Sequence, residues 1–251
     1  MNVSADEPLM AIRNLDKSFG GVKAVDDVSL DLRAGIVTTL VGPNGAGKTT
    51  LFNLITGDVP RDGGTVTWLG RDLAGVSPHR AARRGILRSY QDLRLFDGMT
   101  VYENVLTAVE RNTVPLPISR ARRRARRARI ERVLERTGLA DKRAVRSADL
   151  AYAERKFLSL ARIMAAEARL WLLDEPASGL DPASYDRFLA ILREDVAGGV
   201  TVCIIEHNLD IVVGISDRIA FLDRGRLLAD GEPSAVMADP ELARIYFGDR
   251  E

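Results

Sequence analysis

Hydrophobic and polar residues alternate in two stretches near the start of the chain, Leu9 to Leu15 and Val22 to Leu32. An alternation of period two is typical of strands with one buried face, and Gly20-Gly21 between the stretches indicates a tight turn. We therefore expect a pair of antiparallel strands here. Asp62-Gly63-Gly64 marks a second turn, which predicts a further strand from Thr65 to Leu69.

Elsewhere the apolar residues form runs without alternation. Ile36 to Val41 is a short run rich in β-branched residues, and a helical pattern from Lys48 to Thr56 comes after it. Leu170 to Leu173 and Thr201 to Ile205 are continuous apolar runs, as in strands buried on both faces of a parallel sheet. The order of these runs predicts an α/β fold with a mostly parallel sheet.

The middle of the chain, from about Asp92 to Ala153, has a different character. It is helical in pattern and very basic, and Pro115 and Pro117 interrupt it. We interpret it as a helical subdomain inserted into the sheet-based core. The expected organisation is one domain over residues 8–251, with the core at 8–91 and 155–251 and the inserted subdomain at 92–154.

Composition excludes several classes of protein. The 251 residues include 36 basic and 35 acidic side chains, and this balance argues against a dedicated nucleic-acid binder. The longest apolar stretches, such as Val200 to Ile205, are too short to span a bilayer, and the polar start from Asn2 to Pro8 resembles no secretory signal. Cys203 lies in an apolar run, so we expect a buried, inert thiol. A cytoplasmic protein is expected.

A glycine-rich turn after Val41 matches the phosphate-loop pattern of Gly, four residues, then Gly-Lys-Thr. It consists of Gly42, Pro43, Asn44, Gly45, Ala46, Gly47, Lys48 and Thr49, and Thr50 is the next expected contact. The glycines would let backbone N–H groups point at phosphate oxygens, and the following helix start favours the same negative charge. Lys48 would neutralise the β- and γ-phosphates, and the Thr49 hydroxyl would ligate Mg²⁺. The strand before the turn favours this interpretation over a chance glycine-rich turn.

A pair of acids ends the apolar run at Leu170 to Leu173. Asp174 and Glu175 follow it directly, and a buried strand that ends in carboxylates needs a cation or a ligand. Asp174 would hold Mg²⁺ through water, and Glu175 would orient and deprotonate the attacking water. One of the two acids could instead cap the turn at Pro176, which explains the pair less well.

These motifs together resemble the nucleotide-binding subunit of an ABC transporter over nearly the whole chain. Asp174-Glu175-Pro176 followed by Ser178-Gly179-Leu180-Asp181 resembles the family's acidic strand end and D-loop. Glu206-His207-Asn208 lies where the family has its switch histidine. The resemblance implies ATP hydrolysis, with His207 contacting the γ-phosphate. It also implies a phosphate-loop (RecA-like) core, an N-terminal antiparallel β part and an inserted α-helical subdomain.

Two further positions take a role from the resemblance. Gln91, within Arg88-Ser89-Tyr90-Gln91-Asp92, is similar to the Q-loop glutamine, which approaches Mg²⁺ at the joint between core and helical subdomain. Phe19 lies where the family stacks an aromatic ring on adenine, and any aromatic residue can stack in this way. The alternative for Phe19 is packing in the core.

The family's signature segment departs from its usual pattern. Leu-Ser-Gly-Gly-Gln is replaced by Leu150, Ala151, Tyr152, Ala153 and Glu154. In the family this segment caps the γ-phosphate held by the partner subunit, but Ala151 has no hydroxyl to donate and Ala153 cannot adopt glycine-only conformations. A hydrogen bond to a charged group is worth roughly 1.5–3 kcal/mol, so capping would weaken by about tenfold or more. The backbone N–H groups of the next helix, expected from Arg155 to Met164, would still favour an anion.

Four stretches resemble one subfamily, the ATP-binding subunits of branched-chain (hydrophobic) amino acid importers. They are Leu87 to Phe96, Met99 to Val105, Gly214 to Ile219 and Tyr246-Phe247-Gly248. This resemblance implies integral-membrane permease partners, a second ATP-binding subunit in a heterodimer, and indirectly a solute-binding protein, at the cytoplasmic face of the inner membrane. The alternatives are the ATPase of a urea, amide or lipopolysaccharide transporter, a soluble ABC ATPase, and a regulatory module that binds ATP without hydrolysis.

An arginine cluster from Arg120 to Arg129 lies in the expected helical subdomain. Seven of its ten residues are arginine, and on a helix they would cover every face. A solvated basic face is one interpretation. Contact with anionic lipid headgroups or with an acidic permease loop is another. Nucleic-acid binding ranks third, because no groove-reading motif accompanies the cluster.

Overall fold

The computed structural model describes residues 8–110 and 119–247, so the expected helix breakers Pro115 and Pro117 lie outside the described residues. The chain divides into two compact units. The first comprises Met1–Leu87, Arg169–Glu175 and Asp195–Glu251, and the second comprises Arg88–Ala168 and Pro176–Glu194. Each unit is described by itself below.

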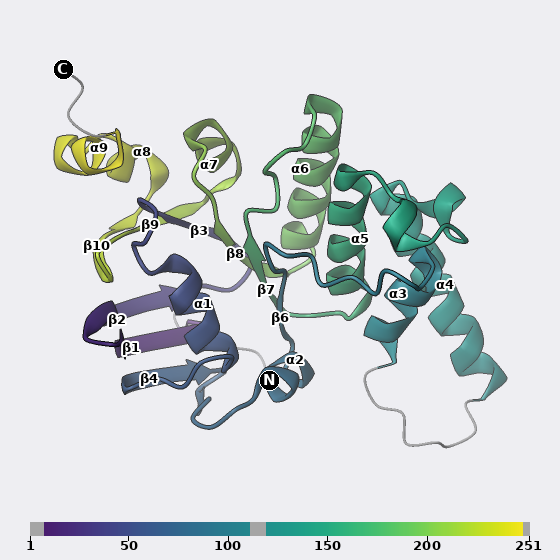
Figure 1. Ribbon diagram of the computed structural model, residues 1–251, viewed down its shortest axis with the longest axis horizontal. Coiled ribbons are helices and arrows are strands. Elements are labelled where there is room, and N and C mark those ends of the chain that lie inside the picture. The colour runs from purple at the N-terminus through teal and green to yellow at the C-terminus, as the bar shows by residue number, and fades with distance from the viewer. Residues whose placement is uncertain (1–7, 111–118, 248–251) are drawn as a thin grey trace. The chain divides into compact units, whose positions relative to one another are not determined.

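A four-stranded antiparallel sheet opens the first unit (Figure 1). Its order is β2-β1-β4-β5, with β1 at Met10–Phe19, β2 at Val22–Leu32, β4 at Gly63–Trp68 and β5 at Arg71–Asp72. The predicted antiparallel pair is confirmed, since β1 and β2 pair from Met10↔Leu32 to Phe19↔Val22. The glycines expected as a turn before Thr65 instead begin β4. A Cβ on Gly64 would lie 2.2 Å from the Asn14 carbonyl oxygen, so only glycine allows this close approach.

A second, six-stranded sheet carries the parallel pairing that the apolar runs predict. Its order is β10-β9-β3-β8-β7-β6. The strands are β3 (Val37–Val41), β6 (Ile86–Arg88), β7 (Leu170–Asp174), β8 (Thr201–Ile205), β9 (Arg218–Asp223) and β10 (Arg226–Gly231). β3 is parallel to β8 and β9, and β7 is parallel to β8, whereas β10 is antiparallel to β9. The mostly parallel sheet is confirmed.

The two faces of this sheet bury different sets of side chains. Leu40, Ala220 and Leu222 face a large core that includes Leu51 and Phe52 of α1 (Lys48–Thr56) and residues of the antiparallel sheet. Their neighbours in sequence, among them Val41 and Phe221, face a smaller core with residues from the C-terminal helices. The helices of the first unit besides α1 are α2 (Pro78–Arg83), α7 (Leu209–Ile215), α8 (Pro233–Met237) and α9 (Pro240–Phe247). α1 is thereby held beside both sheets, with its N-terminus at the end of β3 (Figure 1).

Helices make up the second unit. They are α3 (Val101–Val109), α4 (Arg120–Thr137), α5 (Tyr152–Ala165), two short 3₁₀ turns (Ala140–Lys142 and Ser147–Asp149), and α6 (Pro182–Ala197), which ends in the first unit. α5 packs against α3 and α4. Arg136 of α4 forms an ion pair with Glu194 of α6 at 3.0 Å. The unit is therefore wider than the inserted segment expected at 92–154, because α5 and most of α6 pack with it.

The helix expected from Arg155 to Met164 begins three residues earlier, at Tyr152, so that prediction of its start is wrong. The carboxylate of Glu154 accepts a hydrogen bond from the Ala151 N–H at 3.0 Å, which stabilises the earlier start as half of a capping box. Within the described residues, no helix has both the length and the apolar character needed to cross a membrane.

Candidate functional site

The phosphate-loop segment links β3 to α1, as the sequence predicts, and two of its glycines are sterically required. A Cβ on Gly42 would lie 1.9 Å from the Leu222 carbonyl oxygen, and a Cβ on Gly47 would lie 2.2 Å from that of Ala24. Both residues also have positive φ values, +144° and +99°. Strands β9 and β2 thus press against the loop so closely that side chains at these positions cannot fit.

Hydrogen bonds hold the rest of the loop in a tight turn. The Ala46 N–H donates to the Pro43 carbonyl at 3.2 Å, and the Gly225 N–H donates to the Ala46 carbonyl at 3.0 Å. Asn44, Gly45 and Thr49 are exposed. The loop is therefore anchored on its inner side and open on its outer side, where an anion would approach the helix N-terminus.

Lys48 is the central cation of this loop. Its side chain is buried, and Nζ donates to the carbonyl oxygens of Gly42 at 2.6 Å and Pro43 at 2.8 Å. Burial lowers the pKa of Lys48 below its usual range, while the negative charges of Glu175 and Asp174 act to raise it. The ammonium group therefore lies among these carboxylates, desolvated but still a strong partner for a phosphate.

The pairing of β7 with β8 fixes the positions of the two acids. Asp174 is the last residue of β7 and is 7% exposed, and Glu175 comes next with a positive φ of +46°. The Glu175 N–H donates to the Ile205 carbonyl at 3.0 Å, at the end of β8. A non-glycine residue in this region of φ is strained, and such strain clusters at functional sites because the surrounding structure holds the side chain in a defined place.

His207 lies beside Glu175, two residues after β8. The imidazole Nδ1 is 3.6 Å from Glu175 Oε1, too far for a hydrogen bond but close enough for attraction when the imidazole is protonated. The His207 side chain is 56% exposed, whereas that of Glu175 is 25% exposed. The histidine is therefore free to reach a bound group beside the carboxylate.

Tyr246 of α9 contacts the segment that carries His207, a contact that no sequence motif predicted. Its phenol donates a hydrogen bond to the His207 carbonyl oxygen, and its ring meets that of Phe221 edge-on at 6.1 Å between centroids. Burial, and next the charge of the fully buried Glu206, raises the pKa of Tyr246. Only Tyr246-Phe247-Gly248 pointed to this region, as a subfamily likeness, and nothing local in sequence brings Tyr246 to His207.

Phe19 ends β1 next to the Gly20-Gly21 turn. It is 48% exposed, and the Lys17 ammonium lies 5.3 Å from its ring centroid. The core-packing alternative is not supported, because a core phenylalanine would be buried. The hairpin that carries Phe19 also supplies Ala24, which presses on Gly47, so an exposed ring belongs to the same hairpin that borders the loop.

Gln91 belongs to the second unit, in the irregular segment between β6 and α3. It is exposed. Its neighbour Tyr90 is flanked by two guanidinium groups, with Arg94 at 3.6 Å and Arg88 at 4.9 Å from the ring centroid. The segment around Gln91 is therefore cationic and aromatic, and the glutamine's part in binding a metal stays a prediction.

The signature segment, also in the second unit, forms the start of α5. Leu150 is buried, whereas Ala151 and Tyr152 are exposed. Ala153 lies in the first helical turn, so this position needs no glycine conformation here. Glu154 forms an ion pair with Lys142. This partner lowers the pKa of Glu154 most, the Ala151 N–H lowers it further, and burial acts in the opposite direction. The carboxylate thus accepts a hydrogen bond from the N–H group of the residue just before α5.

The first unit therefore brings Lys48, Thr49, Asp174, Glu175 and His207 to one end of the parallel sheet. A loop with an anion-binding helix N-terminus, a buried lysine and a strand-end acid pair define a nucleoside triphosphatase with a phosphate loop. Thr49 and Asp174 are hard oxygen donors of the kind that Mg²⁺ prefers. Among the described residues no cluster of three or more His, Cys, Asp or Glu could hold a metal by itself.

Comparisons with known proteins agree with this class. The model of the ABC transporter family matches residues 25–178. The branched-chain amino acid transport ATP-binding protein LivG of Salmonella typhimurium is 39% identical, with 97% of this chain and 99% of LivG covered. BraF of Pseudomonas aeruginosa, with the same description, is 37% identical over 96% and 98% of the two chains. The chain belongs to the ABC transporter family and is an ATP-binding, ATP-hydrolysing subunit.

A solved structure gives the same result for the fold. The ADP conformation of an ATP-binding cassette from an ABC transporter superposes with a TM-score of 0.84, at 29% identity, over 97% of this chain and 100% of that one. The fold class expected from the sequence is thereby confirmed, and so is ATP as the nucleotide.

Proposed function

We propose that this chain drives the import of branched-chain or other hydrophobic amino acids across a membrane. The observation that supports the proposal is the near full-length identity to LivG and BraF, two ATP-binding proteins of branched-chain amino acid transport. The partners would be permease subunits, a second ATP-binding subunit and, indirectly, a solute-binding protein. The chain would work at the cytoplasmic face of the membrane.

The residues of the first unit would divide the chemistry among them. The loop N–H groups and Lys48 would hold the phosphates and stabilise the charge that develops on them. Glu175 would accept a proton from the attacking water, and His207 would steady the γ-phosphate beside it. Thr49 and Asp174 would hold Mg²⁺, which neutralises phosphate charge when bound. This distribution follows from the lysine, the acids and the histidine lying at one end of the sheet.

The test is uptake into vesicles that contain the assembled transporter, with the solute-binding protein outside and ATP inside. We expect ATP-dependent uptake of leucine, isoleucine or valine, and no uptake when the chain carries Glu175→Gln. That variant should still bind ATP, and its turnover should fall by about 10²–10⁴-fold because the general base is lost. Glu135→Gln, which neutralises an exposed carboxylate on α4, is the matched control and should leave uptake unchanged.

Two results would contradict the proposal. Uptake of urea or short amides without uptake of the apolar amino acids would assign a different solute. Turnover by Glu175→Gln at the rate of the unaltered chain would remove Glu175 from the role of base, whatever the solute.

A further inference from the structure

The arginine-rich half of α4 has a charge distribution that disfavours helix formation. Arginines dominate Arg120 to Arg129, at the helix N-terminus, where the helix dipole favours negative charge. Arg120 and Arg124, and likewise Arg122 and Arg126, are four residues apart, a spacing at which like charges destabilise a helix by roughly 0.2–0.5 kcal/mol per pair. The second half of α4 has the buried residues that dock the helix, including Ile130 and Leu134. Helix stability therefore does not account for the cluster.

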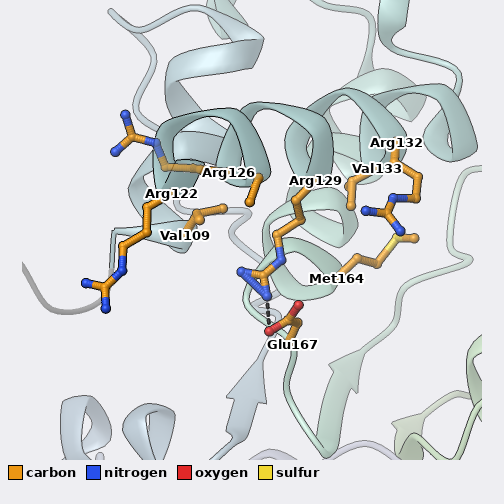
Figure 2. Close-up of a pocket in the computed structure, with 9 residues that line it drawn as sticks. Val109, Arg122, Arg126, Arg129, Arg132, Val133, Met164 and Glu167 are labelled. Atoms are coloured by element: carbon orange, nitrogen blue, oxygen red, sulfur yellow. Dashed lines mark ion pairs between the residues drawn. The ribbon is translucent and has the colours of Figure 1, made fainter. Parts of the chain in front are cut away.

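Several of these arginines line a pocket of about 550 Å³ in the second unit (Figure 2). Arg122, Arg126, Arg129 and Arg132 contribute guanidinium groups, and Glu167 contributes one carboxylate. The spacing of four, three and three residues places the arginines along one side of α4. Four cations and one anion leave the lining with a net charge of +3.

The ion pairs in this pocket leave part of the charge uncompensated. Arg129 pairs with Glu167, as the dashed line in Figure 2 marks, and Arg126 pairs with Glu110. Arg122 and Arg132 form no ion pair with any residue that the structure describes. Burial, and then the nearby charge of Arg132, lowers the pKa of Arg129. The pocket thus concentrates positive charge that an added anion would relieve.

The remaining lining of the pocket is apolar. Val109 at the end of α3, Ala125 and Val133 on α4, and Met164 on α5 lie among the guanidinium groups. A ligand that fits this surface has an anionic group with an apolar part attached to it. Guanidinium binds phosphate bidentately, and apolar side chains beside it suit the first methylene groups of an acyl chain.

We propose that this pocket binds the headgroups of anionic phospholipids, with one phosphate at Arg122 and another at Arg132, which lie at opposite ends of the pocket (Figure 2), and the adjoining chains against Val109, Val133 and Met164. The exposed arginines outside the pocket, Arg120, Arg123, Arg124 and Arg127, favour a lipid surface over a single acidic peptide. They extend the positive charge beyond one binding pocket, which suits a plane of many phosphates. All residues of the pocket belong to the second unit, and the proposal does not depend on the transported solute.

The test is co-sedimentation of the full chain with vesicles of equal parts phosphatidylcholine and phosphatidylglycerol, compared with vesicles of phosphatidylcholine alone. We expect binding to the anionic vesicles only. Arg122→Gln combined with Arg132→Gln should weaken that binding by more than about a hundredfold, since each change removes a direct charge-assisted hydrogen bond worth roughly 1.5–3 kcal/mol. Arg123→Gln combined with Arg124→Gln removes the same charge from the same helix outside the pocket, where each arginine contributes on the order of 1 kcal/mol through the surface potential, and should weaken binding by about ten- to thirtyfold.

Both double variants replace exposed side chains, so unchanged ATPase activity shows that each remains folded. Equal binding to neutral vesicles, or an equal loss in the two double variants, would overturn the proposal. A third result would also overturn it. If a permease complex in phosphatidylcholine nanodiscs retained the unaltered chain but not the variant with changes at Arg122 and Arg132, the occupant of the pocket would be an acidic segment of the permease. Failure of vesicle binding would leave the ATPase assignment intact.

Discussion

Single residues shape the predicted nucleotide site through backbone conformation and through charge. Gly42 and Gly47 allow neighbouring carbonyl groups to approach the loop at distances that a Cβ would block. The Lys48 ammonium group is desolvated and lies among the loop carbonyls and the strand-end acids. Glu175 occupies a strained conformation beside His207. We expect these features together to position the site residues for a phosphate.

Gly47→Ala tests the steric requirement of the loop. The new Cβ would meet the Ala24 carbonyl oxygen at 2.2 Å, so the loop must shift, and we expect nucleotide affinity to fall by more than about tenfold. Gly35→Ala is the matched control, since Gly35 also has a positive φ, +70°, but open space around it. It should destabilise the fold by about 1–2 kcal/mol and leave affinity unchanged. Titration with a fluorescent ATP analogue and thermal unfolding measure the two effects, and similar affinities of the two variants would contradict this prediction.

Tyr246→Phe tests whether α9 positions the switch histidine. The change removes the hydrogen bond to the His207 carbonyl but keeps the ring that meets Phe221. A neutral hydrogen bond is worth about 1 kcal/mol, so we expect kcat to fall by about fivefold with little change in KM for ATP. Tyr102→Phe, on α3, should change neither quantity. A proportional rise in KM, or a loss of stability without a change in kcat, would mean that Tyr246 acts on folding and not on His207.

At the scale of elements, α5 shows how a side-chain cap stabilises the start of a helix. Glu154 returns its carboxylate to the Ala151 N–H, and Lys142 holds it from the side. The helix therefore begins within the signature segment, with a negative charge in its first turn. That charge suits the helix dipole but repels an anion at the same end. We expect this chain's signature to cap a partner's phosphate weakly.

Glu154→Gln should therefore strengthen capping. In the complex with the second ATP-binding subunit, we expect the KM for ATP to fall by about two- to fivefold, because a charge at a helix end contributes about 0.3–1 kcal/mol. Glu103→Gln is the control. Glu103 caps α3 through Thr100 in the same way and also has a lowered pKa, so it should alter stability to a similar extent without changing KM. Equal KM values for the two variants would refute a role for Glu154 at the nucleotide.

At the scale of the whole molecule, the predicted nucleotide-site residues fall in both units. The first unit has the phosphate loop, the acids and the histidine, and the second has Gln91 and the signature. The site residues of the first unit are of the types that the family pattern predicts. The signature segment in the second unit departs from that pattern at Ala151 and Glu154. A chain of this kind is best completed by a partner with a better signature, which is why we favour a heterodimer.

This asymmetry predicts the behaviour of the Glu175→Gln variant in size-exclusion chromatography with ATP. The variant alone should elute as a monomer, and together with the second ATP-binding subunit of its transporter it should elute as a heterodimer. When Lys48→Ala is added to the Glu175→Gln variant, the fraction that elutes as a heterodimer should fall, because the altered phosphate loop no longer holds ATP for the partner to cap. An ATP-dependent homodimer of comparable affinity would contradict the proposed pairing.

Much of the fold and of the nucleotide site could be predicted because the relevant patterns are local. The period of two in β1 and β2, the unbroken run of β8, and the order of strand, glycine turn and helix around Lys48 all reflect backbone preferences within a few residues. The structure confirms these elements, and Cys203 is buried in β8 with a raised pKa, as the apolar run indicated. The predicted start of α5 was wrong because a side-chain cap, which periodicity does not reveal, stabilises the helix from an earlier residue.

The sequence alone determined that this chain folds around a phosphate loop with a strand-end acid pair, because those motifs depend on short-range geometry. Only the tertiary structure decided what lies against them. Ala24 and Leu222 make two glycines irreplaceable, Tyr246 reaches His207, and the arginines of α4 meet Met164 around a pocket. These contacts join residues that are distant in the chain, and packing between elements creates them, so no local pattern encodes them.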